Sequence, residues 1–112
     1  MSENILLDKS LDFAVEVVEL CNTLNTNIAL TTQLIKSGTS IGANLREAHY
    51  AQSRADFKSK LQIALKECFE TEYWLELLCR TNIITTKQFD HLVCECRKIR
   101  AMLVSSVNKT IL

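Results

Sequence analysis

Apolar residues recur along the chain at spacings of three and four, which is the period of an amphipathic α-helix with one buried face. The pattern predicts a first helix over about residues 6–24 and a second over about residues 28–50. A third follows Ser53 and ends before the turn at 81–84, and a fourth starts near Thr85. For the first helix we expect a buried stripe of Leu7, Leu11, Ala14, Val18 and Cys21, with Phe13, Val17, Leu20 and Leu24 widening that face.

Short polar segments separate these helices and contain residues that favour helix starts. Asn27 is a candidate cap for the second helix, and Ser53, three residues before Asp56, is one for the third. Thr85 and Gln88 have the spacing of a capping box. Because connections this short join antiparallel neighbours, the pattern predicts an up-down-up-down four-helix bundle.

Composition favours an all-α fold. The 112 residues include no proline, two glycines and 47% hydrophobic residues, so the turns that a β-sandwich or a barrel needs are missing. The length fits one domain over residues 1–112. Gly38 lies in the apolar stripe of the second helix, which predicts either the close approach of a neighbouring helix or a kink.

A polar stripe runs along the second helix beside the apolar one. Ser40, Asn44 and Glu47 are spaced four and three residues apart, so they share one side of the helix. In the third helix Glu72 interrupts the apolar stripe. We expect these four side chains to form a structural polar cluster that fixes the alignment of the helices, because buried polar groups need hydrogen-bond partners. The alternative, a general acid and base formed by Glu47 and Glu72, lacks accompanying substrate-binding residues.

The sequence lacks the residue patterns of catalysis and cofactor binding. It contains no phosphate-binding, dinucleotide-binding, zinc-protease or nucleophile-elbow motif, and no Glu-x-x-His pair of the kind that di-iron bundles use. Cys94 and Cys96 diverge around a helix, so they do not form a zinc-binding pair. We therefore expect no catalytic residues, no cofactor and no metal ion.

The five cysteines fall at positions where a small core residue fits, which favours free thiols in a reducing compartment. Asp8 and Lys9 interrupt the N-terminal apolar run, so we expect no secretory leader. No apolar run approaches the ~20 residues that cross a bilayer. The sequence thus favours a cytoplasmic protein without a membrane partner.

Charge is balanced over the whole chain but not along it. Residues 1–24 carry five acids and one base, a net charge of −4, whereas residues 82–112 carry five bases and two acids, a net charge of +3. The two ends therefore have the charges to pair within a subunit or between subunits.

Two further groups of residues are candidates for contact with partners. The basic cluster of Arg97, Lys98 and Arg100 is the best candidate for a nucleic-acid patch, although ordinary solvated helices also carry such charges. The apolar group at the end of the third helix suits a contact between subunits. Its members are Tyr73, Trp74 and Leu77.

A series of short motifs between Ser40 and Leu75 points to a known family. They read S-I-G-A-N-L-R-E-A at 40–48, A-D-F at 55–57, A-L at 64–65 and E-T-E at 70–72. In this combination the chain resembles the four-helix-bundle proteins encoded in intervening sequences of bacterial 23S rRNA genes. Arg46 and Ala48 depart from the family pattern, in which a small residue and a glycine are usual.

The resemblance implies a ring-like homopentamer without an established enzymatic activity. It extends to the accessory variability proteins of diversity-generating retroelements, which contact nucleic acid and a reverse transcriptase through a basic surface. Two hypotheses follow. The first is a non-enzymatic, self-assembling interaction scaffold. The second is an RNA- or DNA-binding accessory protein whose basic patch is repeated around the oligomer.

Overall fold

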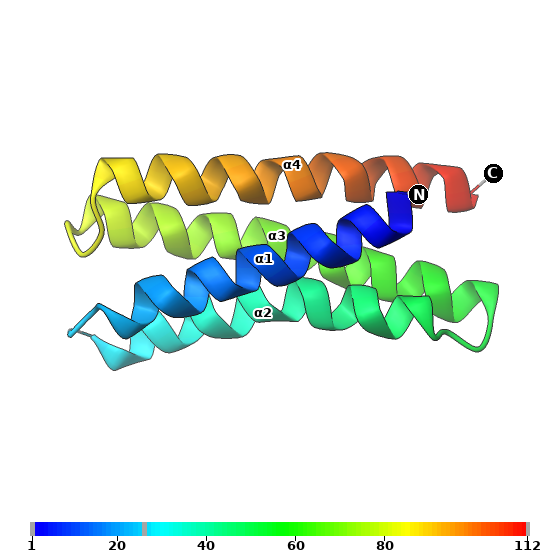
Figure 1. Cartoon of the computed structure of the whole chain (residues 1–112), viewed down its shortest axis with the longest axis horizontal. Helices are drawn as coiled ribbons and strands as arrows, with labels where there is room; N and C mark the ends of the chain where they lie inside the picture. The colour runs from blue at the N-terminus through cyan, green and yellow to red at the C-terminus, as the bar shows by residue number, and fades with distance from the viewer. Residues whose placement is uncertain (1, 26, 112) are drawn as a thin grey trace.

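The computed structural model describes residues 2–25 and 27–111, and the side chains of residues 5–25 and 27–109. Within these residues it contains four helices: α1 spans Ser2–Asn22, α2 Ile28–His49, α3 Arg54–Arg80 and α4 Thr86–Ile111. Each helix runs opposite to the one before it, and the bundle measures 43 × 20 × 19 Å (Figure 1). The prediction of an all-α, antiparallel up-down-up-down four-helix bundle is confirmed.

Each helix packs on two neighbours. α1 packs against α2 and α4, and α3 packs against the same two helices. Within the described residues the diagonal pairs, α1 with α3 and α2 with α4, make no close backbone contact. The outer faces of α1 and α3 therefore lie on opposite sides of the bundle (Figure 1).

The core receives one stripe of side chains from every helix. Burial of each large apolar side chain contributes about 1.5–3 kcal/mol relative to exposure. The largest buried ones are Leu6, Phe13, Leu34, Ile41, Leu75, Leu78 and Leu103.

α1 buries part of the predicted face, including Phe13, Val17 and Leu20, but leaves most of the predicted central stripe at the surface. Leu11 is 52% exposed, and of the predicted stripe only Cys21 is buried. The rotation that the helix adopts removes Phe13 from water, and this aromatic ring has more apolar area than any residue of the predicted stripe. We use the name α1 strip for five neighbouring apolar side chains of α1 that remain partly or fully exposed. They are Leu7, Leu11, Ala14, Val15 and Val18.

The predicted close approach at Gly38 is confirmed. A Cβ atom added to Gly38 would lie 3.1 Å from Cγ1 of Val17 on α1. Gly42, one turn further along α2, meets Ser10 of α1 in the same way, at 3.2 Å from its Oγ. The two glycines therefore let the α1 and α2 backbones approach each other more closely than side chains would allow.

Two of the predicted helix starts are confirmed, and one differs. Ser53 accepts a hydrogen bond from the Asp56 amide at 3.0 Å. Thr85 and Gln88 form the reciprocal capping box, at 2.9 and 3.0 Å. Asn27 stands at the N-cap of α2 but its side chain makes no capping hydrogen bond. Its backbone is left-handed (φ 40°), a conformation that asparagine adopts more readily than most residues.

Candidate functional site

Glu72 joins α3 to α4 through two arginines. Its Oε1 atom lies 3.1 Å from Nε of Arg97, and its Oε2 atom lies 2.8 Å from Nε of Arg100. The Glu72 side chain is only 15% exposed, so the carboxylate is largely withdrawn from water and takes its hydrogen bonds from the two guanidinium groups. The Arg100 guanidinium also lies 4.9 Å from the centre of the Phe69 ring, within the range of a cation–π contact.

Among the described residues, Ser40 and Asn44 make their side-chain hydrogen bonds within α2. The Ser40 hydroxyl donates to the Lys36 carbonyl at 2.6 Å, and the Asn44 amide donates to the Ser40 carbonyl at 2.8 Å. Both side chains are half-buried.

Glu47 does reach another helix, but at the surface. It pairs with Lys60 of α3 at 3.1 Å and is 59% exposed. Lys60 precedes Glu72 by twelve residues on α3, or about 18 Å at 1.5 Å per residue. The structure therefore does not bring Glu47 and Glu72 together, and these two carboxylates do not form an acid–base pair.

The hydroxyl groups that do enter the core were not singled out by the sequence pattern. Each donates to a carbonyl of its own helix three or four residues earlier, so burial leaves none of the hydroxyls unpaired. The sequence does indicate that Ser10 is buried, because it lies four residues after Leu6 and three before Phe13, on the same side of the helix. The buried hydroxyl residues are Ser10, Thr31, Ser37 and Thr71.

The third cation of the basic cluster, Lys98, also has an acidic partner. Its ammonium group lies 3.0 Å from Oε2 of Glu95, three residues earlier on α4. This hydrogen bond raises the pKa of Lys98 and lowers that of Glu95. Arg97 and Arg100 bind Glu72, and Lys98 binds Glu95. Each of the three predicted nucleic-acid contacts is therefore paired with a carboxylate.

The candidate subunit contact lies at the C-terminal part of α3. Tyr73 is 59% exposed, and Trp74 and Leu77 are half-buried. The Tyr73 and Trp74 rings meet edge to face with their centres 5.0 Å apart. The Trp74 indole N–H donates a hydrogen bond to Oε2 of Glu70 at 3.3 Å, so the polar edge of the ring has a partner. An apolar surface with satisfied polar groups is typical of a contact region.

The family model of the 23S rRNA-intervening sequence proteins matches residues 2–105. The chain belongs to this family. It is also similar to a protein of unknown function from the S23 ribosomal protein family of Bacteroides thetaiotaomicron, whose crystal structure has been solved. The two share 50% identity over 96% of this chain and 99% of that one, with a TM-score of 0.94. No curated protein is a significant relative of the chain.

In this member of the 23S rRNA-intervening sequence protein family, the motif at 40–48 forms the second half of α2. Ile41, Leu45 and Ala48 point into the core, and Gly42 lies against α1. The two departures from the family pattern both fit the fold. Arg46 is exposed, and Ala48 is buried inside the helix, where alanine favours helical backbone.

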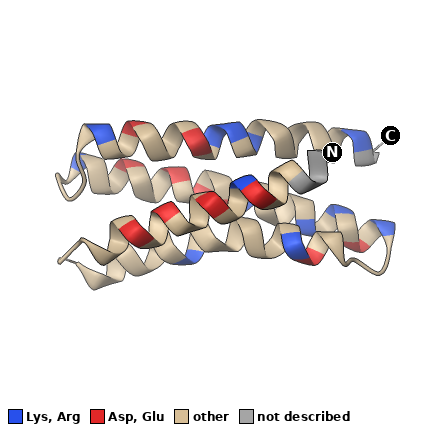
Figure 2. Ribbon diagram, viewed as in Figure 1, with Lys and Arg blue, Asp and Glu red and all other residues tan. Residues whose placement is uncertain are grey.

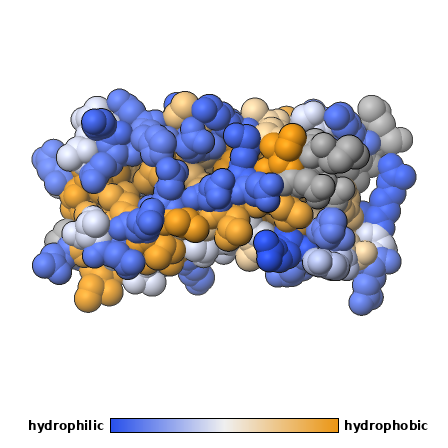
Figure 3. Space-filling model, in the orientation of Figure 1, coloured by the Kyte–Doolittle hydropathy of each residue, from blue (hydrophilic) through white to orange (hydrophobic). Residues whose placement is uncertain are grey.

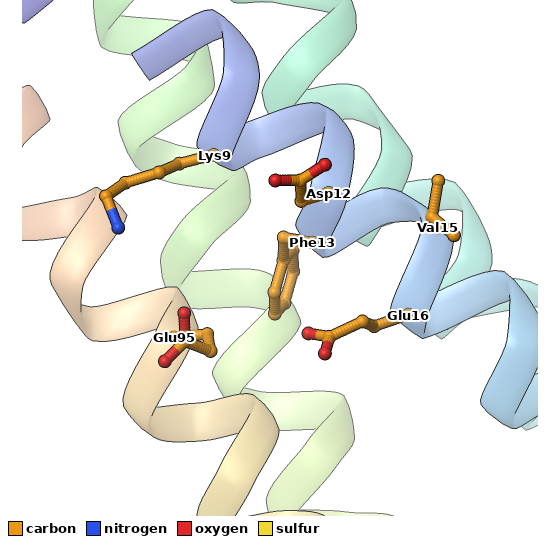
Figure 4. A pocket seen from close by; sticks show the side chains of 6 residues that line it. All are labelled: Lys9, Asp12, Phe13, Val15, Glu16 and Glu95. Carbon is orange, nitrogen blue, oxygen red and sulfur yellow. The ribbon is translucent and has the colours of Figure 1, made fainter. Parts of the chain in front are cut away.

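The described surface of this family member has several hollows. One of 440 Å³ lies between α1 and α4, and Figure 4 shows Asp12, Glu16 and Glu95 pointing into it with Lys9 at its side. Glu16 also pairs with His91 at 2.8 Å. Among the residues whose side chains are described, no group of three His, Cys, Asp or Glu is arranged to hold a metal ion.

The thiols divide between the core and the surface. Cys21, Cys68 and Cys96 are buried as predicted, whereas Cys94 is exposed, which corrects the expectation that every cysteine occupies a core position. Hydrogen bonding of the protonated Cys68 thiol with the Cys96 side chain, together with burial, raises the pKa of Cys68, so its reactive thiolate is disfavoured. Within the described residues, no helix is both long and apolar enough to cross a membrane.

Proposed function

We propose that this chain is a non-enzymatic, cytoplasmic protein that self-assembles into a homopentamer and acts as an interaction scaffold. The observation that carries the proposal is the α1 strip, in which Leu11 and Val15 are 52% and 48% exposed. Neighbouring side chains of the same strip are half-buried. Contiguous apolar surface of this kind marks contact sites, because covering it with a second copy removes it from water.

The polar groups of the bundle support a structural role. The carboxylate of Glu72 is occupied by two arginines, and that of Glu47 by a lysine. Catalysis requires titratable groups that converge on one enclosed space. Glu47 and Glu72 lie far apart along the bundle, so these two carboxylates do not converge on one space.

The pentameric number rests on the resemblance to the family, and the test is the mass of the protein in solution. Sedimentation equilibrium at micromolar concentrations is expected to give about five times the 12.7 kDa of one chain. A mass of one chain over the whole concentration range would contradict self-assembly, and a different multiple would contradict the pentamer alone.

A nucleic-acid-binding accessory role has less support. The basic cluster of Arg97, Lys98 and Arg100 has a net charge of +1 once its two paired carboxylates, Glu72 and Glu95, are counted. This small excess would add up to a larger basic surface only if a ring repeated it in every subunit. If the role is correct, a gel shift with RNA should appear at low salt and disappear when the three residues are changed to Glu. Circular dichroism of that variant serves as the folding control. The role is excluded if no shift appears at low salt.

A further inference from the structure

A second apolar surface lies on the outer face of α3, on the side of the bundle opposite the outer face of α1. Phe69 and Tyr73 are one helical turn apart and are 52% and 59% exposed. Leu77, one turn further along, is half-buried. We use the name α3 strip for these three residues. Its surface includes a hollow of 180 Å³ beside Tyr73 and Leu77.

The borders of the two strips carry opposite charge. Along α1 the residues next to the strip are mainly acidic, and Figure 2 marks several Asp and Glu positions in red along this helix. In Figure 3 this hydrophilic band over α1 is bordered by hydrophobic side chains over α1 and α2. The charged residues of the band are Asp8, Lys9, Asp12, Glu16 and Glu19, with a net charge of −3. On the other side of the strip Arg46 of α2 lines a hollow together with Leu7, Leu11 and Ala14, so the charged residues around the strip sum to −2.

The border of the α3 strip has the opposite sign. The Arg100 guanidinium lies over Phe69, and Arg80 lines the hollow beside Tyr73. Four cations and three carboxylates surround the strip, a net charge of +1. They are Lys66, Arg80, Arg97 and Arg100, against Glu70, Glu72 and Glu76.

We propose that the α1 strip of one copy packs against the α3 strip of the next copy. The inference rests on the proposed self-assembly and adds which surfaces meet. A contact between two unlike surfaces is heterologous, and repetition of such a contact closes a ring when the rotation between copies allows it. The opposite border charges favour this pairing, whereas a contact of the α1 strip with itself would bring two acidic borders together.

The test uses one variant for each strip. Leu11→Lys places a cation opposite the basic border of the α3 strip, and Tyr73→Asp places an anion opposite the acidic border of the α1 strip. Both positions are exposed, so each variant is expected to fold, with unchanged helicity by circular dichroism. Each variant alone should be monomeric by light scattering. Mixing them should restore association, because each variant retains the strip that the other lacks.

The controls are Ser105→Lys and Ser105→Asp, at an exposed position of α4 that belongs to neither strip. Both should keep the mass of the unchanged protein. Native mass spectrometry of the mixture is expected to show complexes that contain both Leu11→Lys and Tyr73→Asp chains. The proposed pairing is overturned if either variant keeps the mass of the unchanged protein, or if the mixture contains no such complexes. If the unchanged protein is itself a monomer, the proposed self-assembly fails first.

Discussion

At the scale of single residues, Glu72 is the most constrained polar group of the described surface between α3 and α4. One carboxylate, 15% exposed, holds two arginines that are three residues apart on α4. Without it, the two guanidinium groups would repel each other beside the Phe69 ring. Hydrogen bonds between charged groups contribute more than neutral ones when water is partly excluded, which makes this carboxylate a joint between the two helices.

We therefore expect Glu72→Gln to lower the free energy of unfolding by about 1–2 kcal/mol, because the amide keeps the shape but loses the charge that holds both arginines. Urea denaturation measures the change. The matched control is Glu76→Gln, which removes an exposed pair with Arg80 on the same helix and should cost less than about 0.5 kcal/mol. Equal losses of stability from the two substitutions would contradict the conclusion that Glu72 joins α3 to α4 more strongly than an exposed ion pair does.

At the scale of elements, the contact between α1 and α2 depends on two glycines one turn apart. Gly38 faces the fully buried Val17, and Gly42 faces the fully buried Ser10. Glycine in a helix interior costs about 1 kcal/mol relative to alanine. The cost is offset because the backbones approach closely and the side chains of α1 pack directly on α2.

Gly38→Ala tests this contact. The added methyl group would lie 3.1 Å from Cγ1 of the fully buried Val17, which would have to shift by a few tenths of an ångström to admit it. We expect the overlap to exceed the gain in helix propensity, with a net destabilisation of about 1 kcal/mol by thermal or urea unfolding. Val17→Ala should then cost less in the Gly38→Ala background than alone. Additive effects would show that the two positions do not compete for space.

The contact between α1 and α4 includes a pair that responds to pH. The Glu16 carboxylate accepts a hydrogen bond from His91 at 2.8 Å and raises the pKa of His91 above its ordinary value, with Glu95 adding to the effect and Lys98 opposing it. Because the folded-state pKa is the higher one, the pair stabilises the fold fully below the ordinary pKa of about 6.5. That contribution is lost as the pH rises through the folded pKa.

We expect an NMR titration of His91 to have a midpoint above about 6.5, and Glu16→Gln to lower that midpoint. The accompanying loss of stability on raising the pH should be below about 1 kcal/mol, because the pair is exposed. A midpoint that does not respond to Glu16→Gln would contradict the hydrogen bond.

At the scale of the whole molecule, the bundle carries apolar side chains on two opposite sides. The α1 strip and the α3 strip remain in contact with water in one copy of the chain. A bundle of this length buries one stripe per helix and has no further layer to cover its outer faces. The assembly proposed above would remove both strips from water at once.

Self-assembly makes stability depend on concentration. We expect the Tm of the unchanged protein to rise with protein concentration over the micromolar range, since dilution favours separated chains. The Tm of Leu11→Lys should be independent of concentration, because this variant is expected to be monomeric. The measurement is differential scanning fluorimetry over a hundredfold dilution. A constant Tm for the unchanged protein would argue against assembly coupled to folding.

Much of the bundle follows from local signals. The spacing of apolar residues predicts four helices, and the Ser53 cap and the Thr85–Gln88 box predict where α3 and α4 begin. These signals are local because a helix and its cap are formed by residues within a few positions of each other. The α1 boundaries were less accurate, since the helix begins at Ser2 and ends at Asn22.

Of the candidate residues, the sequence indicated that Glu72 would need a partner but not which one. The sequence pattern assigns Arg97 and Arg100 to a separate basic patch, whereas the structure places both on Glu72. The two arginines lie 25 and 28 residues after Glu72 in the chain, and the spacing of residues within one helix does not predict contacts over that distance. The roles of Ser40 and Asn44 also depended on packing, because both amide and hydroxyl groups can bond within their own helix.

The sequence by itself determined that this chain forms four antiparallel helices, because periodicity and capping act over one or two turns. Only the tertiary structure decided how α1 is rotated. Two adjacent apolar stripes compete for the core, and the choice depends on the combined packing of Phe13 and Val17 against residues far away in the chain. That rotation places Leu11 and Val15 at the surface. The surface that we propose for assembly is therefore a consequence of packing, not of local sequence pattern.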